Sequence, residues 1–231
     1  SKLQQEQNIL RQQTNNSKNI LVLLPLLGII IFIVLYITAT LLYPGGSQID
    51  KNSIGFSWIN NYWCNLLNQK AINGQHNSAK PVAMTGMFVL CLTLSIFWFI
   101  FPRHINVGKK LKLAIQIFGT LSMIIAFFLF TSINHDLIIN LASIFGLVAT
   151  VGAFIGLYKM KSFRLFAFGL LNILFIGLNN YVYYTKGLIV YLPIVQKITF
   201  ATFLFWISCI NISLYREQGK KATNKGISDL L

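Results

Sequence analysis

Six long apolar stretches that contain no Asp, Glu, Lys or Arg follow one another along the chain. Each is close to the roughly 20 residues that an α-helix needs to cross the hydrocarbon core of a membrane. A soluble domain carries about 25% charged residues to keep its surface wet, whereas this chain of 231 residues has 10%. The stretches are Ile20–Tyr43, Pro81–Phe101, Leu113–Ile133, Leu137–Tyr158, Leu165–Tyr184 and Ile198–Tyr215.

These stretches also determine the fold class. Lipid offers no hydrogen-bond partners to a peptide backbone, so a spanning segment must be a helix or a strand of a closed barrel. Barrel strands are short and alternate in polarity, whereas these segments are uniformly apolar. We therefore predict an all-α protein, a polytopic transmembrane helical bundle with six spans over residues 20–215. The first span is about twice as long as the apolar core of a signal peptide, so we expect it to be a retained anchor.

Basic residues gather in alternate connections between the spans. The two tails, the second-to-third connection and the fourth-to-fifth connection hold most of the 19 Lys and Arg residues. This positive-inside pattern accounts for the net charge of +14 without a nucleic-acid partner. We therefore expect the tails 1–19 and 216–231 to be cytoplasmic. The outward connections are then 44–80, 134–136 and 185–197.

The longest outward loop, 44–80, carries a helical pattern. Apolar residues recur at three- and four-residue spacings over 56–67, with asparagines between them. We expect a short amphipathic helix along the outer leaflet there. Its aromatic residues Trp58, Tyr62 and Trp63 would lie at head-group depth, where amphipathic rings are favoured. We also predict that these three residues contribute to ligand binding.

The apolar residues 188–215 are too many for one upright span. Pro193 and Lys197 therefore predict that the first part of this segment is an outer loop or interfacial turn. Lys197 would then extend its ammonium group to the membrane surface.

Polar residues of possible functional importance lie at the outward ends of the spans. His135 and Asp136 precede the fourth span, where they could transfer a proton or bind a polar head group. The alternative is that Asp136 caps the N-terminus of that helix. A shared pocket would also contain Asn73, Asn77, Asn179, Asn180, Tyr183 and Tyr184. An aromatic belt accounts for the two tyrosines equally well.

The residue inventory gives little support to metal or cofactor chemistry. A catalytic zinc site needs three protein ligands, and His76, His135 and Asp136 could supply them only if the loop folds over the bundle. The chain has no nucleophile elbow, no phosphate-binding glycine loop and no pair of histidines within the spans. We therefore predict no metal and no cofactor. The spans also lack the ionisable groups of a coupled ion transporter.

Four short motifs resemble a known family. They are Tyr43-Pro44-Gly45-Gly46, the outer-loop motif Asn61-Tyr62-Trp63-Cys64-Asn65-Leu66-Leu67, Gly86-Met87 and His135-Asp136. This layout is similar to a family of uncharacterised six-helix bacterial integral membrane proteins, although family members usually have an acidic residue where this chain has Asn65. The resemblance implies six helices in a bacterial cytoplasmic membrane and implies no activity.

Three functional hypotheses follow. The first is an accessory protein that binds a membrane lipid or a membrane protein partner through its outer face, because the distinctive polar and aromatic residues concentrate there. The second is a lipid-modifying enzyme that uses His135 and Asp136. The third is a passive channel or transporter with a polar path past Gln116, Asn140 and Asn172.

Overall fold

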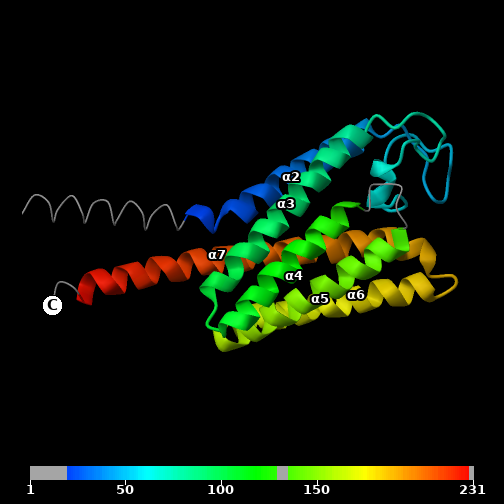
Figure 1. Cartoon of the computed structure of the whole chain (residues 1–231). Helices are drawn as coiled ribbons and strands as arrows, with labels where there is room; N and C mark the ends of the chain where they lie inside the picture. Colours follow the sequence, from blue (N-terminus) through cyan, green and yellow to red (C-terminus); the bar gives the residue numbers. More distant parts are fainter. Residues whose placement is uncertain (1–19, 129–134, 229–231) are drawn as a thin grey trace, which may run out of the picture.

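The computed structural model describes the backbone of residues 20–128 and 135–228, and all their side chains except those of 135, 136, 139 and 219–228. This part of the chain is helical and contains no strand. The helices are α2 (Leu24–Leu42), η1 (Trp63–Leu67), α3 (Lys80–His104), α4 (Lys109–Phe127), α5 (His135–Lys159), α6 (Phe163–Tyr184), η3 (Ile189–Tyr191) and α7 (Leu192–Ser228). Figure 1 shows the long helices side by side, with the residues between α2 and α3 gathered at one end.

Six of these helices are long and apolar enough to cross a membrane, which confirms the predicted all-α bundle of six spans. Such a set of helices is typical of a multi-pass membrane protein. Three of them carry a proline as their second residue, namely Pro25, Pro81 and Pro193. Proline fits the first turn because a helix leaves those N–H groups unbonded.

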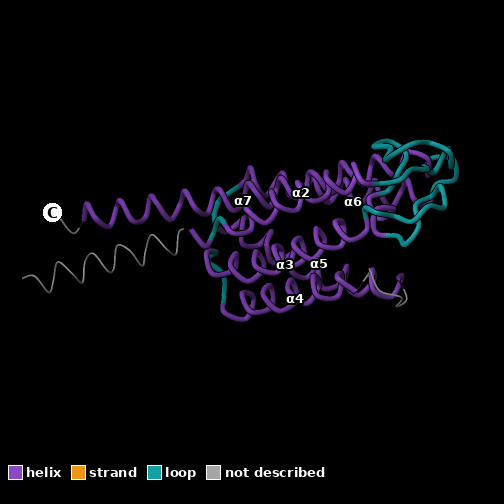
Figure 2. Tube along the Cα trace, turned by 90° about the horizontal axis from the view of Figure 1, so that it is seen from above, coloured by secondary structure: helices purple, strands orange, loops and turns teal. Residues whose placement is uncertain are grey.

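The bundle has two distinct ends. Residues 43–79 and the turn 185–191 lie at one end, which we call the loop end (Figure 2). The short connections 105–108 and 160–162 lie at the opposite end, as does the C-terminal part of α7 (Figure 1). This alternation is what an antiparallel bundle with short connections requires.

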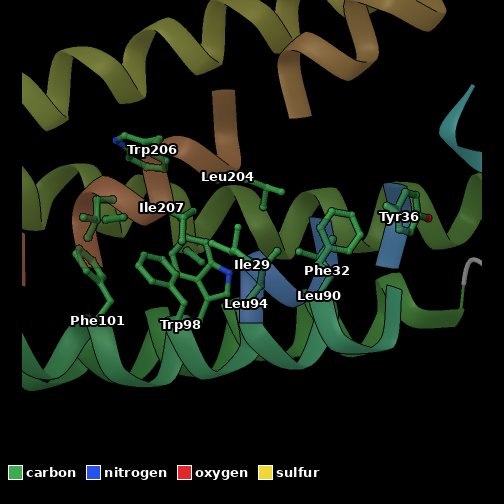
Figure 3. Packing of buried hydrophobic residues seen from close by; sticks show 14 of the residues in the cluster. Ile29, Phe32, Tyr36, Leu90, Leu94, Trp98, Phe101, Leu204, Trp206 and Ile207 are labelled. Carbon is green, nitrogen blue, oxygen red and sulfur yellow. The ribbon is translucent and has the colours of Figure 1, made fainter. Parts of the chain in front are cut away.

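Helices α2 to α5 pack against their neighbours in chain order, and α6 and α7 form a second pair. The two groups meet where α7 contacts α2 and where α5 contacts α6. The core lies between α2, α3 and α7. Figure 3 shows buried side chains from these helices meeting there, including Ile29, Phe32, Leu94, Trp98 and Ile207.

Glycine allows α3 to pack close to α4. A Cβ atom on Gly119 of α4 would lie 2.4 Å from the ring of Trp98 on α3. Without a strong hydrophobic force between helices in lipid, such close packing is a main source of their association. The indole of Trp98 is therefore seated directly on the α4 backbone.

The expected amphipathic helix over 56–67 is not confirmed, because the structure has only the five-residue 3₁₀ helix η1 in that segment. The asparagines that separate the apolar residues explain the difference. Asn61 Oδ1 accepts a hydrogen bond from the backbone N–H of Ser57, and Asn65 Oδ1 accepts one from that of Tyr62. Such side-chain bonds compete with the backbone hydrogen bonds of a helix.

The prediction of an outer loop or interfacial turn at the start of 188–215 is wrong from Leu192 onward, because α7 begins at that residue. Lys197 does not reach the surface either, since only 8% of the residue is exposed. It is held inside by partners in the 43–79 segment, and the sequence pattern near Lys197 does not reveal them.

Candidate functional site: a groove between α2 and α7 under the loop

Residues 43–79 form a folded cap at the loop end, and two buried asparagines hold it together. Asn77 is fully buried, and its Nδ2 donates to the carbonyls of Asn65, Leu66 and Asn68 at 3.2, 3.1 and 2.9 Å. Its Oδ1 accepts from the N–H of Ala79. A buried amide with its hydrogen bonds satisfied fixes a single backbone conformation.

The second buried amide, Asn61, ties the middle of the cap to its beginning. Its Nδ2 donates to the carbonyl of Gly46 at 2.8 Å. Gly46 has a φ of +83°, and a Cβ there would lie 2.4 Å from the backbone nitrogen of Asn73. Glycine is therefore required at the point where the cap folds back on itself.

Lys197 of α7 connects the bundle to this cap. Its Nζ donates to the carbonyl of Asn61, and also to the carbonyl of Pro193 at 2.9 Å. The same Nζ lies 5.7 Å from the centre of the Phe56 ring, within range of a cation–π contact. The ammonium group is thus enclosed by carbonyl oxygens and an aromatic face.

Next to this connection, four aromatic rings from three segments meet. Trp63 of the cap stacks on Tyr36 of α2, with ring centres 4.9 Å apart, and contacts Phe200 of α7 edge-on at 5.3 Å. Phe32, one turn before Tyr36 on α2, contacts both Trp63 and Phe200. Aromatic contacts of this geometry add about 0.5–1.5 kcal/mol each beyond the area that they bury.

Beside these rings, a cavity of about 350 Å³ runs between α2 and α7. Its α7 wall extends from Phe200 to Ser208, which is about 12 Å of helix. Trp58 and Trp63 of the cap also line it. The remaining lining residues are Ile29, Ile33, Tyr36, Ile37, Thr40, Ala201, Leu204 and Phe205. We call this cavity the α2–α7 groove.

The surface that the groove presents to a ligand is almost entirely apolar. The hydroxyls of Thr40 and Ser208 donate to the carbonyls of Ile37 and Leu204 within their own helices, so neither donor is free. The indole N–H of Trp63 is buried and has no hydrogen-bond partner among the described residues. At the margin of the groove, Phe205 is 62% exposed. A site with this lining selects hydrocarbon rather than a strongly polar ligand.

The loop residues predicted to bind a ligand occupy different settings. Trp58 and Trp63 line the α2–α7 groove, and Tyr62 lies between them in sequence, next to Trp63. Asn77 is fully engaged inside the cap, as described above. Asn73 is half-buried, and its Oδ1 accepts from the N–H of Gln75 in a local turn.

The candidate residues at the end of α6 do not line the groove. Asn179 donates to the hydroxyl of Thr199 and so joins α6 to α7. Asn180 donates to the carbonyl of Ile176 in its own helix. Tyr183 and Tyr184 are both exposed, with ring centres 5.0 Å apart, in the manner of interfacial aromatics.

His135 and Asp136 form the first turn of α5, but their side chains lie outside the described part of the structure. The proposed acid–base pair therefore stays a prediction. Among the described residues, no three His, Cys, Asp or Glu side chains gather as metal ligands would.

The surroundings displace the pKa values of Cys64 and Tyr62 in the cap. Loss of solvation raises the pKa of the Cys64 thiol, although the nearby Lys197 ammonium acts in the opposite direction. Loss of solvation also raises the pKa of Tyr62, with smaller contributions from Cys64 and Tyr183. Both groups are therefore held in their protonated forms at neutral pH.

Sequence reasoning missed Lys197, Tyr36 and Phe200 as parts of this region. A signal existed for Lys197, which is the one basic residue in the long apolar segment between Lys186 and Arg216. Nothing in the sequence marks Tyr36 or Phe200, because their importance comes from the meeting of two helices far apart in the chain. No protein-family model, curated protein or solved structure matches the chain.

Proposed function

We propose that this protein is a lipid-binding accessory protein of a bacterial cytoplasmic membrane, and that it holds one acyl chain of a membrane lipid in the α2–α7 groove. The observation that carries the proposal is the apolar cavity of about 350 Å³ between two candidate spans, which Trp58 and Trp63 of the cap also line. Ligand sites of this kind usually have volumes of about 300–1,000 Å³ and mostly apolar walls.

An acyl chain suits this groove better than other occupants. Water gains little there, because a stable buried water needs two to four polar partners and the hydroxyls of Thr40 and Ser208 are already bonded. The exposed side chains at its margin, Ile33, Ile37 and Phe205, would face the hydrocarbon of the bilayer. A lipid could therefore enter sideways without leaving the membrane.

The charge pattern supports an outward position for the groove. Arg103, Lys109 and Lys161 lie at or beside the connections opposite the loop end. The positive-inside rule assigns that end to the cytoplasm and the cap to the outer side. Trp58 and Trp63 would then lie near the outer head groups, where tryptophan is favoured.

A photo-crosslinking experiment tests the proposal. The protein would be reconstituted in nanodiscs that contain a phospholipid with a diazirine on one acyl chain, and the crosslinked peptides would be mapped by mass spectrometry. We expect crosslinks in the α2 and α7 peptides that contain Ile33 and Ala201. The Ala201→Trp variant, which places an indole in the groove, should reduce them about tenfold.

A matched control variant is available on α6. Leu178→Trp adds a comparable side chain on the exposed face of α6, beside Asn179, which bonds to Thr199 of α7. It should leave the groove crosslinks unchanged, because Leu178 does not line the groove. Uniform crosslinking around the bundle in all three proteins would reject a specific lipid site.

A further inference from the structure

Lys197 is an unusual residue to find buried at the edge of an apolar helix bundle. Lysine is almost never buried unless it is paired, because its ammonium group is costly to remove from water. Here only 8% of the residue is exposed, and main-chain carbonyls rather than a carboxylate accept its hydrogen bonds. A methionine would fill a similar space without that cost, so packing alone does not account for the amine.

The hydrogen bond to Asn61 spans 136 positions of sequence and joins two walls of the groove. On the α7 side, Lys197 precedes Phe200 and Ala201 by about one helical turn. On the cap side, Asn61 lies two residues before Trp63, the first residue of η1. The bond therefore holds the turn that carries Trp63 against the part of α7 that carries Phe200.

Neighbouring contacts make this bond decisive for the position of Trp63. The Trp63 ring lies between Tyr36 of α2 and Phe200 of α7, with ring centres 4.9 and 5.3 Å away. Aromatic contacts tolerate sliding and tilting, as the range of observed ring geometries shows. A charge-assisted hydrogen bond is shorter and more directional, so it limits where the turn can lie.

We propose that Lys197 is the positioning residue of the lipid groove: its ammonium group holds the Asn61–Trp63 segment against α7 and so places Trp63 as one wall of the groove. This inference rests on the proposed function. Lys197 acts through Trp63 and does not itself contact the acyl chain.

The test compares Lys197→Met with the control Lys80→Met. Lys80 also bonds to the cap, through Gln69 Oε1 at 2.8 Å, but this contact is exposed and remote from the groove lining. Two measurements would be made in nanodiscs: hydrogen exchange of the amides in residues 61–68, and crosslinking to the diazirine phospholipid. Lys197→Arg, which retains the charge and several donors, provides a rescue variant.

We expect Lys197→Met to accelerate exchange of the 61–68 amides about tenfold, the effect of losing a hydrogen bond to a charged group. Crosslinks to Trp63 and Ala201 should fall by at least about threefold. This fall should reflect a lower apparent affinity for the lipid, while the amount of folded protein stays the same. Lys197→Arg should restore part of the crosslinking. Lys80→Met should change neither measurement.

Faster exchange with unaltered crosslinking in Lys197→Met would reduce Lys197 to a stabilising contact and overturn the inference. No change in either measurement would do the same. Absence of groove crosslinks in the unaltered protein would instead reject the proposed function, and the exchange data alone would then show whether Lys197 fixes the cap. If Lys197→Met does not accumulate in the membrane, Lys197→Leu, which also lacks a hydrogen-bond donor, replaces it and the same outcomes apply.

Discussion

The indole ring of Trp63 stacks on the phenol ring of Tyr36, with centres 4.9 Å apart and planes inclined by 30°. This contact joins the 43–79 cap to the second half of the first candidate span. It turns the 43–79 cap from a simple connection into one wall of a groove between helices. The groove, the cap and the packing of the bundle can each be tested separately.

Removing the Trp63 ring should open the groove and loosen the cap. Trp63→Ala loses ring contacts to Tyr36, Phe32 and Phe200. Because Trp63 is only partly buried, we expect a loss of about 2 kcal/mol in the free energy of unfolding, below the roughly 3–5 kcal/mol typical of a fully buried tryptophan. Denaturant unfolding in detergent would measure it. Trp63→Phe keeps an aromatic ring, so it should lose less than half as much free energy of unfolding as Trp63→Ala.

Asn77 should be the most sensitive polar residue of the cap. Asn77→Ala leaves the carbonyls of Asn65, Leu66 and Asn68 without their amide donor. Each unsatisfied buried group costs about 1–3 kcal/mol. Because the surrounding backbone can relax in part, we expect Asn77→Ala to lower the free energy of unfolding by about 3 kcal/mol in total. Proteolysis within 43–79 should accelerate accordingly. Asn73→Ala is the matched control and should cost less than about 1 kcal/mol, because one local bond is lost.

The reactivity of Cys64 should depend on pH in a defined direction. Loss of solvation raises the pKa of its thiol in the folded protein, so less thiolate is present at neutral pH than in a free cysteine. Alkylation by a membrane-impermeant maleimide should lag behind that of glutathione at pH 7 and approach it as the pH rises. A raised folded-state pKa also means that this group's contribution to stability is present below the unfolded pKa and is lost at higher pH. Equal rates for Cys64 and glutathione at pH 7 would contradict the shift.

Close packing of α3 on α4 should make Gly119 intolerant of a side chain. The new Cβ of Gly119→Ala would lie 2.4 Å from the Trp98 ring, which forces the two helices apart. Overpacking of this kind costs about 1–3 kcal/mol, to be measured as the free energy of unfolding. Gly177→Ala on α6 is the control, because a Cβ there would meet no neighbouring atom within 4 Å. It should be neutral or stabilising by up to about 1 kcal/mol through helix propensity.

The charge pattern predicts the orientation of the protein in the membrane, and this prediction can be tested directly. His76 is exposed in the cap, and Lys161 lies in the connection at the opposite end of the bundle. Both variants would be made in a Cys64→Ser background, because the native Cys64 of the cap is itself exposed. In whole cells, His76→Cys should then react with an impermeant maleimide from outside. Lys161→Cys should react only after permeabilisation. The reverse pattern would place the cap and the groove on the cytoplasmic side.

Local properties of the chain were sufficient to predict the six spans. A helix that crosses lipid must be continuously apolar over about 20 residues, and this requirement is visible in any window of the sequence. The structure moves their boundaries by only a few residues in most cases, as in α5 and α6. The alternating basic connections, such as Lys109 to Lys112, are likewise a property of composition.

The groove and its cap depend on partners that no local pattern reveals. The helical spacing of apolar residues over 56–67 was misleading because Asn61 and Asn65 bind backbone groups with their side chains. Lys197 is buried because Asn61, 136 positions away, supplies a carbonyl. Tyr36 and Phe200 enclose a cavity only because α2 and α7 pack side by side. Membrane insertion is thus a sum of local transfer energies, whereas the candidate site arises from contacts between segments that only the folded chain brings together.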